Sequence, residues 1–237
     1  MRKIKNPILI SASVVSIAMV SLLTLSPVTF SASDKYQSMT QLQEATQEGK
    51  DWTIKTSKGT NETLIVAPHG GGIETGTSEI AYEIANKNNA SYYTFKGIRP
   101  INNKELHVTS ANYDEPKAQA MVHESKKTVT IHKTARSGND IYVGGRDDAL
   151  RERITTSLRS EGFDVTEATG NIAGRNLNNI TNQNQQKAGV QIELNNQFAN
   201  QFFKNSDASR PSRENPANWT DRMSAFTDSI NSALNES

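Results

Sequence analysis

Short apolar runs alternate along the chain with segments in which apolar residues recur at helical spacing. The run 64–67 is typical of a buried strand, and the segment 78–87 places its apolar residues on one face of a helix. Predicted strands cover residues 51–55, 62–67, 91–95, 106–110, 128–132, 141–143, 164–167 and 190–194. Predicted helices cover residues 78–87, 116–125, 146–161, 196–203 and 219–234. Strand, glycine-rich turn and helix in this order predict an α/β layer fold.

Two long segments lack both patterns. Residues 171–187 are rich in Asn and Gln, and we expect them to form a long surface loop near the functional site. Residues 205–218 contain Pro211 and Pro216, which predict a loop before the last helix.

Residues 1–32 have the layout of a secretory signal: basic residues at the start, a charge-free apolar stretch and small residues near the end. An uncleaved membrane anchor is the alternative, because the apolar stretch approaches the roughly 20 residues that a spanning helix needs. The polar stretch that follows favours removal, so we expect a secreted protein with no stable membrane association after cleavage. The expected organisation is a signal peptide at 1–32, a loosely packed polar lead-in at 33–50 and one domain at 51–237.

Removal of the signal changes the charge of the protein. The whole chain has 26 basic and 25 acidic residues, and loss of three basic residues leaves a net charge near −2. This balance disfavours a nucleic-acid-binding protein. Cysteine is absent, so a metal ion has to be bound by His, Asp and Glu.

A histidine follows the buried run 64–67 and is itself followed by three glycines. His69 therefore lies where open α/β sheets place ligands, at the carboxyl end of a strand. The glycines allow a sharp turn and the close approach of a metal ion or substrate. Glu74 on the same loop is the expected carboxylate ligand, and Glu79 on the first turn of the next helix is the alternative.

His132 ends another predicted strand and is the second expected imidazole ligand. Two histidines and one carboxylate, with a water in the fourth position, are typical of a catalytic zinc site. Glu193 lies on the apolar strand 190–194, where we expect a cleft position and a role as general base. The solvated face of an edge strand is the alternative for Glu193. His107 is expected to hydrogen-bond the substrate or a supporting carboxylate, and His123 to lie on a helix surface.

Several short segments together resemble the phage-type poly-γ-glutamate hydrolases, a family that shares the fold of the zinc carboxypeptidases. The matching segments are 67–74, 76–80, 107–116, 131–132, 143–147, 176–182 and 189–194. The resemblance implies a single three-layer α/β domain with a mixed, mostly parallel sheet flanked by helices. It also implies one zinc ion and hydrolysis of the γ-amide bonds that link glutamates in poly-γ-glutamate.

The same resemblance implies residue roles. Zinc would be held by His69, Glu74 and His132, and Glu193 would take the position of the general base. Zinc carboxypeptidases space the first histidine and the glutamate as HxxE, whereas His69 and Glu74 are farther apart. Glu79 therefore stays an alternative ligand.

A polyanionic substrate needs cationic partners. Arg136, Arg146 and Arg175 lie in or beside loops predicted near the carboxyl edge of the sheet, where a guanidinium can bind a carboxylate through two hydrogen bonds. Arg146 is the first candidate, and an ordinary helix-start residue paired with Asp147 or Asp148 is its alternative.

Two other functions fit parts of the pattern. A metallo-amidase or peptidase acting on γ-glutamyl linkages of cell-wall peptides would need the same constellation of residues. A non-catalytic exported polyanion-binding domain would contain structural histidines and would bind no metal.

Overall fold

The computed structural model describes Met1 and residues 34–236. The predicted signal peptide lies outside the described residues, apart from Met1. Among the helices of the described residues, none is both long and apolar enough to span a lipid bilayer.

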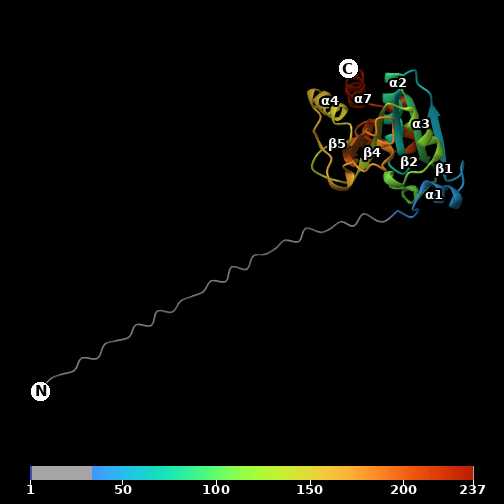
Figure 1. The fold of residues 1–237 in the computed structure, drawn as a ribbon, viewed down its shortest axis with the longest axis horizontal. Coiled ribbons are helices and arrows are strands. Elements are labelled where there is room, and N and C mark those ends of the chain that lie inside the picture. Colours follow the sequence, from blue (N-terminus) through green and yellow to red (C-terminus); the bar gives the residue numbers. More distant parts are fainter. Residues whose placement is uncertain (2–33, 237) are drawn as a thin grey trace. The chain divides into compact units, whose positions relative to one another are not determined.

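One sheet of seven strands organises the described part of the chain (Figure 1). Its strands are β1 (Trp52–Ser57), β2 (Thr63–Gly71), β3 (Ser91–Gly97), β4 (Lys127–Thr134), β5 (Ile141–Gly145), β6 (Val165–Glu167) and β7 (Val190–Asn195). They lie in the order β1-β3-β2-β4-β7-β5-β6, and the central strands β3, β2, β4 and β7 are parallel to one another. The sheet is mixed because β1 and β5 run antiparallel to their neighbours β3 and β7.

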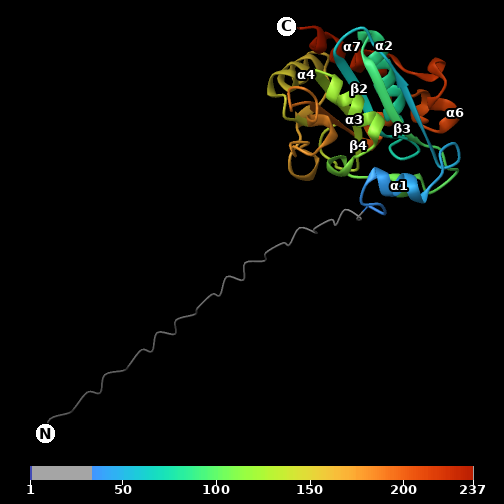
Figure 2. The ribbon, with the colours of Figure 1, turned by 45° about the vertical axis from the view of Figure 1, so that its right-hand side comes forward.

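Helices cover both faces of this sheet (Figure 2). The α-helices are α1 (Met39–Ala45), α2 (Thr77–Asn88), α3 (Pro116–Glu124), α4 (Asp148–Ser160), α5 (Asn196–Asn200), α6 (Arg210–Arg213) and α7 (Asp221–Asn235). The 3₁₀-helices are η1 (Asn103–Leu106), η2 (Ser110–Asn112), η3 (Gly170–Ile172), η4 (Ile180–Asn182), η5 (Lys204–Ser206) and η6 (Pro216–Asn218). Helices α2, α4 and α7 pack on one face, whereas α1 and α3 pack on the other. The predicted three-layer α/β architecture with a mostly parallel sheet is confirmed.

Alternating side chains of the central strands fill two separate cores. On β2, Ile65 and Ala67 belong to the core that contains α2, α4 and α7, while Leu64 and Val66 belong to the core that contains α1 and α3. All four side chains are fully buried. A continuous apolar run is therefore what this strand requires, since parallel strands are covered on both faces.

The segment 33–50 was expected to be loosely packed, and its described part is not. Helix α1 begins at an N-cap, Ser38, whose Oγ accepts a hydrogen bond from the backbone N–H of Gln41 at 3.2 Å. Met39 and Leu42 are fully buried in the core beneath α1 and α3. The folded domain therefore begins upstream of the predicted boundary.

Three other predictions differ from the structure. Residues 106–110 form no strand, because η1 and η2 with an irregular turn between them take that place. Residues 171–187 form a surface loop only in part: residues 175–178 and 185–187 are exposed, but Asn182 and Asn184 are fully buried, and their side-chain amides bind backbone carbonyl groups. The predicted loop 205–218 contains the short helix α6.

Candidate metal centre

The end of β2 turns so that His69 and Glu74 face each other. His69 is buried, and its carbonyl oxygen accepts the backbone N–H of Glu74 at 2.8 Å. Gly71 has a φ of +67°, and a Cβ on Gly70 would lie 2.0 Å from Ser78 Oγ. The turn therefore requires glycine at both positions, because a side chain would be strained or would clash.

One ring nitrogen of His69 is committed to the backbone. Nε2 lies 2.8 Å from the carbonyl oxygen of Val108, and since a carbonyl can only accept, Nε2 carries the hydrogen and donates it. Burial lowers the pKa of His69 to about 4, so the ring is neutral near pH 7. Nδ1 then presents its lone pair to Glu74 Oε1, which lies 3.1 Å away.

His132 on β4 completes a cluster around the same carboxylate. Its Nδ1 lies 3.6 Å from Glu74 Oε2, and the backbone N–H of Lys133 donates to that oxygen at 2.9 Å. Burial opposes ionisation of Glu74, but His69 and His132 outweigh it and lower the pKa of the carboxyl group. One ligand atom from each of His69, Glu74 and His132 lies within 4.8 Å of the other two.

These three side chains fit a divalent metal ion. His69 Nδ1 and Glu74 Oε1 are two acceptors that face each other with no hydrogen between them, an arrangement that a cation stabilises. His132 Nε2 is buried and has no hydrogen-bond partner within the described residues. Two imidazoles and a carboxylate are the donor set of catalytic zinc sites, which keep one position for water or substrate.

Glu193 lies next to His132, because the two residues pair in register on β7 and β4. It is 6% exposed, and its Oε1 accepts a hydrogen bond from Gln191 Nε2 at 2.9 Å. Gln191 Oε1 in turn accepts from Asn179 Nδ2 at 2.8 Å, which fixes the orientation of the Gln191 amide. Burial raises the pKa of Glu193 to about 7, while His132 opposes the shift. A buried carboxyl group on a central strand contradicts the edge-strand alternative and suits proton transfer near neutral pH.

Glu79, the alternative carboxylate ligand, belongs to a different cluster. Its Oε1 lies 3.3 Å from Lys96 Nζ and its Oε2 lies 3.8 Å from Arg213 Nε, and all three side chains are buried. Lys96 also binds Glu214 at 2.8 Å. The structure therefore contradicts Glu79 as the ligand and places Glu74 beside both histidines.

His107 lies against the cluster but binds a different carboxylate. Its Nδ1 is 2.6 Å from Asp34 Oδ1, and its ring centroid is 4.0 Å from that of His69. Its Nε2 is 3.8 Å from Glu74 Oε1. The supporting carboxylate expected for His107 is therefore Asp34. His123 is exposed on α3, as predicted.

The predicted position of Arg146 and Arg175 at the carboxyl edge of the parallel strands is wrong. Because β5 runs antiparallel to β7, Gly145 pairs with Val190 at the amino end of β7. Arg146 follows there and donates to the carbonyl oxygen of Arg175 at 3.3 Å, while Arg175 donates to that of Gly145 at 3.2 Å. Both backbones thus lie at the edge opposite the metal cluster.

Arg136 lies at the predicted edge, just after β4. Its guanidinium donates to the carbonyl oxygen of Thr169 and to Asn171 Oδ1, both at 3.1 Å. It also lies 5.8 Å from the ring centroid of Tyr142, which pairs in register with Glu193. Arg136 is therefore fixed on the same side of the sheet edge as the candidate base.

Lys133 is a residue of the site that sequence analysis missed. Its Nζ donates to Thr75 Oγ1 at 3.3 Å and to Asn200 Oδ1 at 3.1 Å. Burial lowers the pKa of Lys133 to about 8. Its position directly after His132 could have indicated that it belongs to the site.

Two supporting residues were also missed. Tyr113 donates to the carbonyl oxygen of Pro68 at 2.9 Å and so holds the residue before His69. Gln191 orients Glu193, and its place two residues earlier on the same strand face could have indicated this.

The sequence profile of the family described as poly-gamma-glutamate hydrolase matches residues 36–229. The chain belongs to the poly-gamma-glutamate hydrolase family. A solved structure described as a bacteriophage poly-gamma-glutamate hydrolase aligns with a TM-score of 0.81 at 30% identity, covering 85% of this chain and 97% of that one. A structure described as zinc-free YNDL aligns with a TM-score of 0.78 at 30% identity, covering 85% and 98%.

Curated relatives of this poly-gamma-glutamate hydrolase family member come from Bacillus subtilis. The SPbeta prophage-derived protein YoqZ is 36% identical over 174 residues, which are 73% of this chain and 62% of YoqZ. The chain thus spans less than two thirds of that relative. YmaC is 31% identical over 205 residues, 85% of this chain and 86% of YmaC. The resemblance drawn from the short sequence segments is confirmed at the level of the family.

Proposed function

We propose that this chain is a zinc-dependent hydrolase that cuts γ-glutamyl amide bonds of poly-γ-glutamate. The observation that carries the proposal is the buried cluster of His69, Glu74 and His132, with Glu193 paired beside His132. Family membership supports the reaction class, and the donor set of two imidazoles and one carboxylate supports zinc.

The chain's own residues divide the chemistry among them. Zinc, when bound, supplies a Lewis acid that polarises the amide carbonyl and lowers the pKa of water. Glu193 takes a proton from the attacking water and returns it to the leaving amine. Gln191 and Asn179 keep the Glu193 carboxylate in one orientation through consecutive hydrogen bonds of 2.9 and 2.8 Å. Two hydrogen bonds position His69. Tyr113 binds the carbonyl oxygen of Pro68, the preceding residue, and the carbonyl oxygen of Val108 binds the His69 ring at Nε2.

Substrate carboxylates would be bound by cations that have no acidic partner. Lys133 and Arg136 both follow His132 at the carboxyl edge, and within the described residues the hydrogen bonds of their side chains go to neutral oxygens. Buried Lys96 and Arg213, by contrast, already face carboxylates. We therefore assign Lys133 and Arg136 to the α-carboxylates that every unit of the polymer carries.

The deciding experiment incubates purified, zinc-loaded protein with poly-γ-glutamate and measures the chain length of the polymer and the release of new amino groups. We expect shortening of the polymer, loss of activity on chelation and recovery with zinc. Cell-wall fragments run in parallel test the amidase alternative. Release of amines from wall fragments but not from the polymer would contradict the proposal, and a protein that binds the polymer without cutting it would favour the polyanion-binding alternative.

We also propose that the protein is exported. The basic start and the charge-free apolar stretch of residues 1–32 support this. Fractionation of cells that express the full chain tests it: we expect shortened protein in the medium, and full-length protein retained in the cells would contradict it.

A further inference from the structure

Asp34 lies at the start of the described domain and reaches a histidine far along the sequence. One carboxylate oxygen accepts from His107 Nδ1 at 2.6 Å, and the other accepts the backbone N–H of Thr109 at 2.5 Å. The Asp34 side chain is 16% exposed, and hydrogen bonding to His107 and Thr109 outweighs its burial and lowers its pKa to about 2. Asp34 is therefore an ionised acceptor with both oxygens engaged.

These two bonds bracket Val108, the residue whose carbonyl oxygen accepts the Nε2–H of His69. No strand of the described residues pairs with this segment, because His107 and Thr109 lie between η1 and η2. Within the described residues, the Asp34 carboxylate is the hydrogen-bond partner of the His107 ring. Without it, the imidazole could turn about its side-chain bonds.

The free side of His107 faces the metal cluster. Its ring stacks on His69 at a centroid distance of 4.0 Å, and its Nε2 lies 3.8 Å from Glu74 Oε1. The side chain is 35% exposed, so Nε2 lies where the buried cluster meets the surface. A substrate group that approaches the cluster from this side would meet an imidazole in one fixed orientation.

We propose that Asp34 is a positioning residue of the active site that acts through His107. It comes from the segment directly before α1 and holds the His107 ring over the cluster, so that Nε2 contacts the bound substrate. The proposal rests on the proposed hydrolase function for its consequence in turnover. The geometry of the pair itself can be measured without any substrate.

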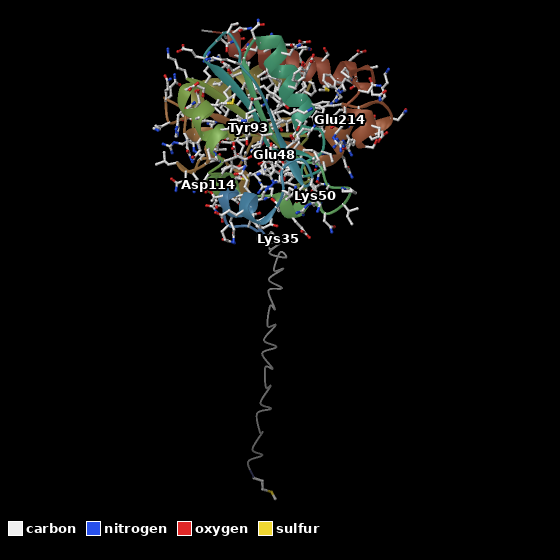
Figure 3. All side chains as sticks on the ribbon, turned by 90° about the vertical axis from the view of Figure 1, so that its right-hand side faces the viewer. Lys35, Glu48, Lys50, Tyr93, Asp114 and Glu214 are labelled. Atoms are coloured by element: carbon white, nitrogen blue, oxygen red, sulfur yellow. The ribbon has the colours of Figure 1, made fainter. Side chains whose placement is uncertain are left out.

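Asp114 supplies a matched control. Its carboxylate also ties the N-terminal segment to the same end of the domain, by accepting from Thr40 N at 3.0 Å and from Thr40 Oγ1 at 2.7 Å. Figure 3 shows Asp114 and Lys35, the residue after Asp34, at that end. Asp114→Asn therefore weakens a tether of the same segment without touching His107.

The test compares kcat and KM of Asp34→Asn, His107→Gln, the double variant and Asp114→Asn. We expect kcat/KM to fall roughly ten- to hundredfold in Asp34→Asn, the range for residues that orient metal-site groups, and to change less than about twofold in Asp114→Asn. In the His107→Gln background, Asp34→Asn should add less than about a twofold loss. Independent losses that multiply, or equal effects of Asp34→Asn and Asp114→Asn, would overturn the proposal.

A second measurement separates this proposal from the hydrolase function. In the metal-free protein, a short bond to a carboxylate should give the His107 Nδ1–H proton a strongly downfield NMR signal. The signal should vanish in Asp34→Asn and remain in Asp114→Asn. Its absence from the unaltered protein would overturn the positioning role, whereas its presence in a protein that leaves poly-γ-glutamate intact would refute only the hydrolase function.

Discussion

Replacement of Glu193 by Gln removes the proposed base with little change in packing. Gln191 Oε1 accepts from Asn179, so Gln191 Nε2 has to donate to residue 193, and a glutamine carbonyl oxygen can accept that bond as the carboxylate does. The cluster of His69, Glu74 and His132 is untouched. Glu193→Gln should therefore retain zinc and fold normally.

The expected loss in turnover follows from the role assigned to the carboxylate. General acid–base catalysis contributes about 10²- to 10⁴-fold, or roughly 3–5 kcal/mol of barrier, so kcat should fall by that factor with KM nearly unchanged. Amine release under saturating poly-γ-glutamate measures kcat, and metal analysis checks zinc content. A Glu193→Gln variant with full zinc and full activity would remove Glu193 from the mechanism.

The same substitution has a pH-dependent effect on the metal-free protein. The pKa of Glu193 is raised from 4.5 to about 7 by burial, so the folded protein binds a proton more tightly than the unfolded chain. Stability is therefore full below pH 4.5 and declines as pH rises through 7, by at most roughly 3 kcal/mol at 1.36 kcal/mol per unit. Urea unfolding should show Glu193→Gln gaining stability over the unaltered protein across this window. If the difference in unfolding free energy between the two proteins does not change with pH, the raised pKa of Glu193 is contradicted.

Three other substitutions test separate parts of the structure. His69→Ala should lose zinc on dialysis, and metal analysis that finds one zinc per chain would contradict the ligand set. Lys133→Gln should raise KM for poly-γ-glutamate about tenfold, the effect of losing one charge-assisted hydrogen bond, and the exposed control Lys58→Gln should leave KM unchanged. An equal rise in KM on polymer whose α-carboxylates are esterified would refute the assignment of Lys133. Glu79→Gln should lower the free energy of unfolding by about 3 kcal/mol, because Lys96 keeps a buried charge with one partner fewer. An unchanged urea midpoint would contradict that last result.

The two histidines of the candidate metal site could be predicted because each carries a local signal. His69 follows a continuous apolar run and precedes glycines, and His132 lies near the end of an alternating strand. Parallel strands bring their carboxyl ends to one edge, so strand-end residues distant in sequence become neighbours. Glu74 could be distinguished from Glu79 only by the turn itself, which returns the backbone N–H of Glu74 to the carbonyl oxygen of His69.

Features that depend on non-local pairing could not be predicted. The direction of β5 decides which edge receives Arg146, and nothing within the segment 141–145 specifies that direction. The contact of Asp34 with His107 joins residues 73 positions apart. The polar composition around Asn182 predicts an exposed side chain. In the structure, its amide is buried and donates to the backbone carbonyl oxygens of Gly174 and Asn176, which would otherwise bind water.

The two ends of the folded domain lie at different distances from the candidate metal site, so we expect them to tolerate added sequence differently. Figures 1 and 2 show α1 and the end of α7 at opposite ends of the folded domain. The carbonyl oxygen of Leu234, near the end of α7, accepts from Lys127 Nζ at the amino end of β4. A purification tag or fusion partner placed after α7 therefore extends away from the candidate metal site. The same addition joined directly to Asp34 would crowd the imidazole of His107, so affinity handles and surface-immobilisation linkers belong at the C-terminal end.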